Sequence, residues 1–482
     1  MASKKIKPPK GTRDLYPEDV LRQRYITNAW RDASLRCGFD EIAGPTFEST
    51  ELYAVKSGEG ILGELFQTFS GKGGQETLDK LVEKGKADFA LRPEFTPTLA
   101  RMYAAHAKQL PKPCKWFTAG PYFRAERPQR GRLREFLQWN VDAIGLPSED
   151  ACSESKAQMD AEVIECSIRL FDNLGLNSET LNIKINDRNA MAAFFNSLSV
   201  SEEQLETAFN LLDRQAKLPA DALCTLAQEA SLSEAFINFL TQSDSSISPK
   251  LDTPDLDTLL SLCNDAQFDQ WMSKDPSIAR GLAYYTGTVF EAIADGERAV
   301  AGGGRYDNLI ELFGGPPTPA CGFGMGDVVL GNLLDDKGLM PEGAELMDAV
   351  ARQQASIRPI AFVVPNGDED NESLVHTLTA NLRRGIESEE WRNNDDRKPW
   401  QSSRYSVAPI HARVSYKSTR KINKLKADAS DQHAKFFVEI QSDNKVELTN
   451  MDTRESIAPP AGSWNVDPNS ENYIGKAIAQ LM

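Results

Sequence analysis

The stretch PYFRAERPQRGRLREFLQWNVDAIG, residues 121–145, decides how the fold of this chain is interpreted. It has the pattern of a β-hairpin: one strand ends at FRAE, ERPQRG forms a loop, and a second strand runs from Arg132 onward. Successive side chains of a strand point to opposite faces of a sheet. One face of the second strand is therefore predicted to be apolar. The other face is predicted to carry Arg132, Arg134, Phe136, Gln138, Asn140 and Asp142.

That polar face is an unusual surface to build for packing alone. Five arginines lie within eleven residues of the hairpin, at positions 124, 127, 130, 132 and 134. A guanidinium group matches two oxygens of a phosphate at once, and an aromatic ring can stack on a nucleotide base. The alternative is the ordinary solvent-exposed face of a half-buried sheet. The density of arginines favours a nucleotide site over that alternative.

The composition limits the classes to which the protein can belong. At 482 residues, the length predicts about three domains. A hydrophobic content of 40% and a charged content of 26% are ordinary for a globular protein. No apolar run approaches the roughly 18 residues of a membrane span, and the N-terminus MASKKIKPPK lacks an apolar segment. We therefore expect a cytoplasmic protein with no membrane contact.

The cysteines and histidines do not form a metal-binding pattern. The seven cysteines include no C-x-x-C pair, and none of the four histidines lies in a motif, so we expect no tightly bound metal and no disulfide framework. Any catalysis or ligand binding must then depend on Arg, Glu, Gln and Tyr side chains. The net charge of −16 argues against indiscriminate nucleic-acid binding. A local basic surface can still act within a Debye length of about 8 Å.

The chain divides into regions of different character. Residues 1–188 and 276–340 indicate an α+β core on an antiparallel sheet with flanking helices, and 189–275 indicate an inserted helical module. Residues 341–357 are predicted to be a helical linker. In 358–482, strands alternate with helices, which indicates a small α/β domain with a mixed sheet. Its polar segment 388–405 is predicted to be a mobile surface insertion.

Three further segments contain candidate site residues. In ALRPEFTPTLARMY (90–103), Glu94 and Thr96 could hold an ammonium group, although a capping or turn role for Thr96 is equally compatible. In ARGLAYYTGTVFEA (279–292), Arg280 precedes a predicted strand and could project into a cleft. In CGFGMGDVVL (321–330), alternate glycines leave one strand face without side chains, where a ligand could lie against the backbone. A packed core strand is the alternative for this last segment.

Together and in this order, the segments resemble those of histidyl-tRNA synthetases, which are class II aminoacyl-tRNA synthetases. KGTRDLYPED (10–19) resembles the N-terminal signature of the family, and PTFESTELY (45–53) resembles motif 1, with Pro45 at the expected dimer contact. FRAERPQRGRLREFLQ resembles motif 2, and GFGMG resembles motif 3. RGLAYYTGTVFE and GGGRYDNL resemble the two histidine-specific segments, and residues 415–440 resemble the anticodon-binding domain.

The resemblance implies an enzyme that activates histidine with ATP and Mg²⁺ to histidyl-adenylate and transfers it to tRNA(His), working as a homodimer. It assigns the histidine amino group to Glu94, Thr96 and Gln138, and the imidazole pocket to Tyr285 and Tyr306. Arg124 and Arg280 would be catalytic, facing the α-phosphate and the reacting carboxylate. The remaining ATP contacts would come from Glu126, Arg132, Phe136, Gly324 and Gly326.

The resemblance also implies two surfaces for tRNA. Arg127, Gln129 and Arg130 in the motif 2 loop would meet the acceptor end. Lys417, Lys421 and Lys424 would lie on one face of a helix predicted over 417–428. A solvated helix without a ligand is the alternative for that basic run.

Three positions depart from the family pattern. Ala283 replaces the acid of the usual RGLDYY, and Asp142 stands where Glu is frequent. Val328 and Val329 replace the Glu-Arg of motif 3, whose arginine holds the γ-phosphate of ATP. Asp327 is a candidate metal ligand beside this gap.

These departures leave three interpretations. The first is an active synthetase that holds the γ-phosphate through other cations or magnesium. The second is a non-catalytic regulatory or tRNA-binding relative, although the regulatory paralog of histidine biosynthesis lacks the C-terminal domain. The third is a synthetase for another amino acid. We favour the first, because the other arginines of the catalytic type and the residues of the histidine pocket are present.

Overall fold

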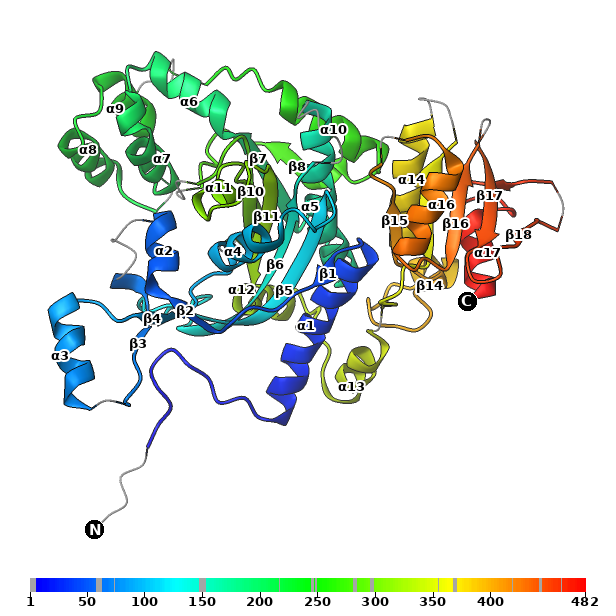
Figure 1. The fold of residues 1–482 in the computed structure, drawn as a ribbon, viewed down its shortest axis with the longest axis horizontal. Helices are drawn as coiled ribbons and strands as arrows, with labels where there is room; N and C mark the ends of the chain where they lie inside the picture. The colour runs from blue at the N-terminus through cyan, green and yellow to red at the C-terminus, as the bar shows by residue number, and fades with distance from the viewer. Residues whose placement is uncertain are drawn as a thin grey trace, which may run out of the picture.

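The structure is a computed structural model that describes residues 6–482 except 58–62, 73, 147–152, 216, 244–246, 248, 281–283, 295–298, 354, 367–370, 418, 442–443 and 461. A large central sheet is flanked by helices, and helices α6–α9 lie beside it (Figure 1). A smaller α/β part contains the C-terminus. In the described residues, no helix is both long and apolar enough to span a membrane.

The central sheet has eight strands in the order β1-β5-β6-β11-β10-β9-β7-β8. Only β1 with β5 and β7 with β8 pair in parallel; all other neighbours are antiparallel. The prediction of an antiparallel sheet is therefore confirmed. The strands are β1 (Asp40–Glu41), β5 (Cys114–Phe123), β6 (Glu135–Ile144), β7 (Leu181–Asp187), β8 (Met272–Lys274), β9 (Thr288–Ala294), β10 (Ala301–Arg305) and β11 (Ala320–Gly326).

The predicted hairpin is formed by β5 and β6, which pair from Cys114↔Ile144 to Phe123↔Glu135. Its apolar face, with Trp139 and Val141, lies in the main core, which also includes residues of helices α1 (Pro17–Arg36) and α5 (Ser153–Asn173). The second strand starts later than predicted, because the backbone N–H of Arg134 donates to the carbonyl of Gly11 at 2.8 Å. Arg132 and Arg134 therefore belong to the loop and not to the strand.

The segment before the hairpin contributes a small sheet and three helices. Strands β2 (Phe47–Ser49), β4 (Phe89–Leu91) and β3 (Gln67–Thr68) form the small sheet in the order β2-β4-β3. Helices α2 (Thr50–Ser57) and α3 (Gln75–Lys84) lie between these strands in the sequence, and α4 (Thr96–His106) follows them. Helices α4 and α11 (Leu309–Leu312) share a separate apolar cluster that includes Tyr122 and Tyr306.

The inserted helices have a core of their own. Helices α6 (Arg188–Ser197), α7 (Leu205–Asp213), α8 (Ala220–Glu229) and α9 (Glu234–Leu240) surround a cluster centred on Phe195, Phe209 and Phe236. Helix α10 (Pro254–Asp265) instead buries Leu256, Leu259 and Cys263 in the main core, and β8 joins the central sheet. Residues 254–274, which the sequence groups with the module, thus pack with the central sheet.

The predicted linker is docked onto the core. Helix α13 (Gly343–Arg352) buries Leu346 and Ala349 in the same core cluster that contains residues of α1. Helix α12 (Asp327–Asp336) follows β11 directly and buries Leu330 and Leu333 there. Helices α12 and α13, which lead from the central sheet to the C-terminal part, are therefore both packed against the main core.

The C-terminal part is built on a mixed sheet in the order β15-β12-β16-β17-β18, with β19 paired to β17. Strand β12 (Ala361–Pro365) pairs in parallel with β15 (Ala412–Val414) and β16 (Phe436–Ile440). Strand β17 (Lys445–Asn450) is antiparallel to β16, β18 (Ser456–Ile457) and β19 (Trp464–Asn465). Helices α14 (Asn371–Arg384), α16 (Ile422–Asp431) and α17 (Ile474–Leu481) pack against this sheet. The predicted mixed sheet is confirmed.

The segment 388–405, expected to be a mobile insertion, contains regular structure and buried side chains. It contains helix α15 (Glu389–Arg392), and it connects β13 (Ile386–Glu387) to its partner β14 (Tyr405–Val407). The buried Trp391 lies under the guanidinium of Arg404, 5.0 Å from ring centroid to Cζ. Arg404 donates to the carbonyls of Asp172 and Asn173 at the end of α5, at 3.0 and 3.1 Å.

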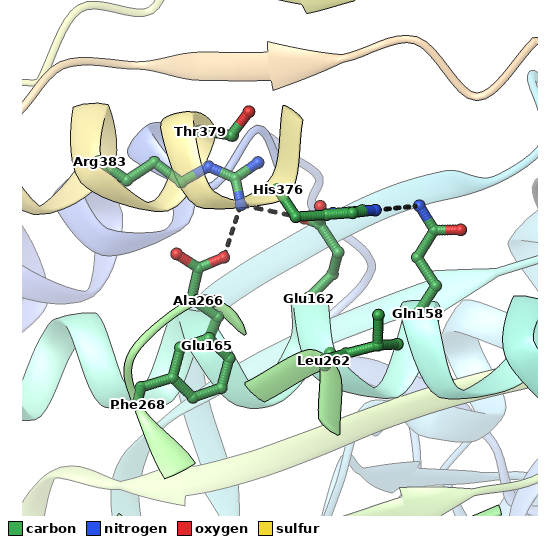
Figure 2. Close-up of a pocket in the computed structure, with 10 residues that line it drawn as sticks. Gln158, Glu162, Glu165, Leu262, Ala266, Phe268, His376, Thr379 and Arg383 are labelled. Atoms are coloured by element: carbon green, nitrogen blue, oxygen red, sulfur yellow. Dashed lines mark hydrogen bonds and ion pairs between the residues drawn. The ribbon is translucent and has the colours of Figure 1, made fainter. Parts of the chain in front are cut away.

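A buried group of charges joins the C-terminal part to the core (Figure 2). Arg383 of α14 pairs with Glu165 and Glu162 of α5 at 2.7 and 3.2 Å. Lys115 of β5 pairs with Glu162 at 2.6 Å. Figure 2 also shows His376 and Gln158 at the wall of the adjacent small cavity. We call Lys115, Glu162, Glu165 and Arg383 the interdomain cluster.

Candidate active site

The candidate site lies on the face of the central sheet opposite α1 and α5. Its floor is made by β6, β11, β10 and β9, where glycines alternate with polar side chains. A Cβ atom at Gly322 would overlap the carboxylate of Asp142, and one at Gly324 would overlap the amide of Gln138. These glycines therefore allow the side chains of β6 to lie across β11.

The two glycines predicted to contact ATP differ in their surroundings. Gly324 is covered by Gln138, as described above. A Cβ atom at Gly326 would come no closer than 3.9 Å to its neighbours, the carbonyl oxygen of Leu137 and Cδ2 of Phe136. Gly326 is thus less crowded than Gly324, because a Cβ atom there would make only van der Waals contacts, whereas Gly324 makes room for Gln138.

Arg280 lies across β10 and reaches β9. A Cβ atom at Gly302 would overlap its guanidinium group, which forms an ion pair with Glu291 of β9. Burial alone would lower the pKa of Arg280, but Tyr285 and Glu291 outweigh it and raise that pKa. The Nε of Arg280 is buried and has no hydrogen-bond partner in the described chain. The arginine is thus charged, and one donor is free for a ligand.

Three tyrosines form one wall of the site. The rings of Tyr284 and Tyr285 are 4.6 Å apart, and those of Tyr284 and Tyr306 are 6.2 Å apart. The hydroxyl of Tyr306 donates to Oδ1 of Asp142 at 2.5 Å. Tyr285 and Tyr306 are therefore linked through Tyr284. Strict alternation along a strand from Leu282 would instead place Tyr284 and Tyr285 on opposite faces. Alternation does not apply at Tyr284, because β9 begins only at Thr288.

Two buried amides of β6 point their polar ends toward this site. Gln138 and Asn140 are 8% and 4% exposed. Gln138 Oε1 and Asn140 Oδ1 have no hydrogen-bond partner among the described residues. Leaving a buried acceptor unpaired costs about 1–3 kcal/mol, so such atoms indicate a place where a ligand supplies the donor. An ammonium group offers three donors.

The segment that contains Glu94 closes the same side of the site. Glu94 lies between β4 and α4, and Thr96 is the buried first residue of α4. The intervening Phe95 belongs to the cluster that contains Tyr122 and Tyr306. Burial lowers the pKa of Arg124, and the nearby Glu94 and Glu126 carboxylates oppose this effect. Glu94 is thus electrostatically coupled to the arginine of motif 2.

The residues predicted to bind ATP gather around the end of the hairpin. The guanidinium carbon of Arg124 lies 5.1 Å from the ring centroid of Phe136, and its Nε donates to the carbonyl of Pro93 at 3.2 Å. Arg132 forms an ion pair with Glu126. An aromatic ring, two guanidinium groups and a carboxylate are therefore grouped beside the tyrosine wall, as a nucleotide with its phosphates requires.

Comparison with known proteins agrees with this geometry. The profile of the histidyl-tRNA synthetase family matches residues 11–326. A histidine–tRNA ligase of Haloarcula marismortui is 36% identical over 369 residues, which cover 73% of this chain and 80% of the relative. The chloroplastic/mitochondrial histidine–tRNA ligase of Arabidopsis thaliana is 34% identical over 383 residues, which cover 77% of this chain and 74% of the relative.

The chain belongs to the histidyl-tRNA synthetase family. The function that goes with this membership is the ATP-dependent joining of histidine to tRNA. A solved histidyl-tRNA synthetase from Nostoc covers 100% of both chains at 21% identity and a TM-score of 0.52. That likeness supports the fold.

The motif 2 loop presents its polar tip to solvent. Arg127, Gln129 and Arg130 are exposed, and backbone hydrogen bonds of 2.9 and 3.0 Å between Gln129 and Arg132 close the loop. Arg130 forms an ion pair of 2.5 Å with Asp336 at the end of α12. The three side chains remain a prediction for tRNA contact.

The basic run of the C-terminal part is arranged differently from the prediction. Lys417, Lys421 and Lys424 are all exposed, but helix α16 begins at Ile422. Lys417 and Lys421 therefore precede the helix, and Lys417 pairs with Asp428 at 3.3 Å. The three lysines do not share one helical face, although they remain candidates for tRNA contact.

The motif 3 gap is filled by apolar packing and by an N-terminal arginine. Val329 is buried in the main core. Asp327 accepts from the backbone N–H of Leu137 at 2.9 Å and pairs with Arg13 at 2.7 Å. Both of its oxygens are thus engaged, which favours a structural role over metal binding. In the described part of the chain, no three His, Cys, Asp or Glu side chains cluster as metal ligands. Ala283 lies outside the described residues.

Proposed function

We propose that this site forms histidyl-adenylate and transfers the histidyl group to tRNA(His). The observation that supports this most directly is the pair of unpartnered acceptors on Gln138 and Asn140, which lie on the same face of the sheet as Arg280, beside the tyrosine wall. The acceptors suit the ammonium group of an amino acid. The adjoining Arg124, Arg132 and Phe136 suit the nucleotide.

The first step brings two anions together. A carboxylate oxygen of histidine attacks the α-phosphorus of ATP in line, an O–P bond forms, and the bond to pyrophosphate breaks. Arg124 and Arg280 neutralise the charge that develops, and no covalent enzyme intermediate is required. Catalysis then rests on positioning and fixed positive charge. In the second step, a ribose hydroxyl of the tRNA attacks the histidyl carbonyl, and AMP leaves.

Selectivity for histidine is assigned to the tyrosine wall and to Asp142. Because Tyr306 donates its hydroxyl proton to Asp142, the oxygen of Tyr306 is free to accept from an imidazole N–H. A site that hydrogen-bonds a polar ring rejects apolar analogues, since its buried groups would be left unpaired. The sequence placed Asp142 on the polar face of the strand but assigned it no role in binding histidine.

ATP enters as its Mg²⁺ complex, and Arg13 supplies the cation that motif 3 lacks. Arg13 is the basic residue bound to the first residue of α12, and its side chain is 35% exposed. Asp327 fixes it beside Leu137, the neighbour of Phe136. One guanidinium nitrogen is used by Asp327, which leaves further N–H donors for phosphate oxygens.

The variant Arg13→Gln tests this assignment. We expect KM for ATP to rise about tenfold, the effect of about 1.4 kcal/mol, while the affinity for AMP stays unchanged. Arg22→Gln is the matched control, because Arg22 pairs with Asp335 at the far end of the same helix. Equal losses of ATP and AMP affinity, or an equal effect of Arg22→Gln, would show that Arg13 only holds the N-terminal segment.

We assign the interface of the proposed homodimer to the motif 1 region. Phe47, Phe69 and Phe89 of the small sheet region are 56%, 47% and 43% exposed, and the rings of Phe47 and Phe89 are 5.8 Å apart. Exposed aromatic residues in one patch are typical of an interface. Sedimentation of the wild type and of Phe47→Ser tests this, since a monomeric wild type contradicts the assignment.

A cytoplasmic location is also proposed. The six described cysteines are free, at positions 37, 114, 166, 224, 263 and 321, as is usual in a reducing compartment. Cell fractionation with an organelle marker measures the location directly. Recovery of the protein with an organelle, as the name of the Arabidopsis relative suggests for that protein, would overturn the proposal.

Histidine-dependent exchange between ATP and pyrophosphate tests the proposed function. We expect exchange with histidine and Mg²⁺, and none with phenylalanine or without amino acid. Aminoacylation of tRNA(His), with another tRNA as control, tests the second step. Folded protein that shows no exchange would indicate the non-catalytic interpretation, and exchange with another amino acid would indicate the third.

A further inference from the structure

The segment that contains Arg280 is not held by strand pairing. Strand β8 ends at Lys274 and β9 begins at Thr288, so Arg280 lies in the connection between them. Its φ angle is +47°, in the left-handed region that residues with a side chain rarely adopt. Such a conformation persists only where its surroundings enforce it. Some other group must therefore fix the backbone here.

Arg188, the first residue of α6, contacts this connection at two places. Its Nη1 donates to the carbonyls of Ala279 and Arg280 at 2.9 and 2.8 Å. Its backbone N–H donates to the carbonyl of Gly287 at 2.8 Å. One residue thus holds the backbone on either side of the tyrosine pair. The nearby Asn186 adds a hydrogen bond of 2.9 Å to Ile278.

The same guanidinium packs against the inserted helices. Its carbon lies 3.8 Å from the ring centroid of Phe209 in α7, and Phe209 is part of the core of the helical module. Ala279 belongs to that core as well. Arg188 is itself only 7% exposed. Arg188 therefore contacts both the module and the Arg280 segment.

The guanidinium of Arg188 is buried, and its close contacts are with neutral groups. Burial lowers its pKa to about 10, with Glu206 opposing the shift, so the group stays protonated at neutral pH. Within the described residues, Arg188 forms no ion pair with a carboxylate; its guanidinium contacts backbone carbonyls and an aromatic ring. An arginine used for general stability would more commonly pair with a carboxylate. This arrangement fits a residue that fixes a backbone conformation.

We propose that Arg188 is a positioning residue for the activation of histidine: it fixes the segment with Arg280 and the tyrosine pair, and it links that segment to the helical module through Phe209. The proposal rests on the role assigned to Arg280 above. Its consequence is that the packing of the module on the core sets the rate of adenylate formation. An in-line reaction is sensitive to such placement, because a shift of about 1 Å can cost about 100-fold in rate.

The test compares Arg188→Gln, Arg188→Lys and Phe209→Leu with Arg214→Gln. Arg214 is an exposed arginine at the end of α7, so its change controls for a lost charge in the module. We expect Arg188→Gln to lower kcat for histidine-dependent exchange about 100-fold, with little change in KM for ATP. Arg188→Lys should recover part of the loss, and Phe209→Leu should give a smaller one. Arg214→Gln should match the wild type.

Two measurements separate positioning from general destabilisation. In an Arg280→Ala background, Arg188→Gln should cause no further loss, because the residue through which it acts is gone. Hydrogen exchange of the peptide covering residues 275–280 should speed up in Arg188→Gln but not in Arg214→Gln. The second measurement needs no activity, so it is informative even if the wild type shows no exchange of pyrophosphate. Additive losses, or unchanged hydrogen exchange, would overturn the proposal.

Discussion

The interdomain cluster and the candidate active site both bury charged and polar groups, but they satisfy them differently. In the interdomain cluster, each charge meets an opposite charge of the same chain: Lys115 and Arg383 share Glu162, and Arg383 also binds Glu165. In the active site, Gln138 Oε1, Asn140 Oδ1 and Arg280 Nε are left without a partner in the described chain. Internal pairing indicates a role in holding the domains together. Unpaired groups indicate a place for substrate.

The largest expected effect comes from breaking the cluster. Among the described residues, Arg383→Met leaves Glu162 paired only with Lys115 and Glu165 only with Arg169. Removing one partner from buried ion pairs typically costs about 3–5 kcal/mol. The pKa of Glu162, held at about 2 by Arg383 and Lys115 against the effect of burial, should rise. Denaturant unfolding measures the free energy, and activity below the unfolding transition should stay close to that of the wild type.

Arg384→Met is the matched control for this change. The neighbouring Arg384 binds the neutral side chains of Gln267 and Asn381, so its loss should cost about 1 kcal/mol. If both variants lose the same stability, the cluster does not depend on buried charge, and the comparison between the two regions fails.

In the active site, Arg280→Ala should affect catalysis more than stability. Removing one preorganised donor typically costs about 3 kcal/mol in the transition state, or roughly 100- to 1000-fold in rate. Histidine-dependent pyrophosphate exchange measures this loss, and tRNA affinity should hardly move. The thermal midpoint should fall less than in Arg383→Met, because Glu291, the partner of Arg280, is 17% exposed and not fully buried. A comparable fall in exchange and tRNA affinity would mean that Arg280 is structural.

The sequence predicted the periodic parts of the site but not its long-range contacts. Alternation along β6 correctly separated Gln138 from Trp139, because a strand buried on one face has a strict period of two. It failed at Arg132 and Arg134, since the N–H of Arg134 donates to the carbonyl of Gly11 and the strand begins only after it. No local pattern indicates a partner more than a hundred residues away.

The fold could be predicted for segments whose burial follows from their composition. It could not be predicted for segments that one or two side chains hold in place. The polar segment 388–405 suggested mobility, yet Trp391 and Arg404 fix it. Arg404 binds carbonyls at the end of α5, where the helix dipole favours a cation. The role of Arg188 was equally hidden, since its partners are backbone carbonyls that carry no sequence signature.

The smallest predicted effect is at His411. This residue is buried and titratable, and both of its ring nitrogens have hydrogen-bond partners within the chain, so it tests whether internal pairing acts on stability. Its Nδ1–H donates to the carbonyl of Ser356 at 2.9 Å, and its Nε2 accepts from Arg413 at 3.0 Å, so only the neutral ring fits. Burial, and then Arg413, lower its pKa from 6.5 to about 3. Between these values the unfolded chain binds a proton that the folded chain does not.

Stability should therefore fall as pH falls from 6.5 toward 3, with a contribution from His411 of up to about 1.4 kcal/mol per pH unit. His411→Gln should remove this contribution and flatten the profile measured by unfolding at pH 7, 6, 5 and 4. The exposed His433 provides the control His433→Gln, which should follow the wild type. Should the profile of His411→Gln remain as steep as that of the wild type, the buried ring is not what links folding to pH, and internal pairing alone does not keep a titratable group neutral in this protein.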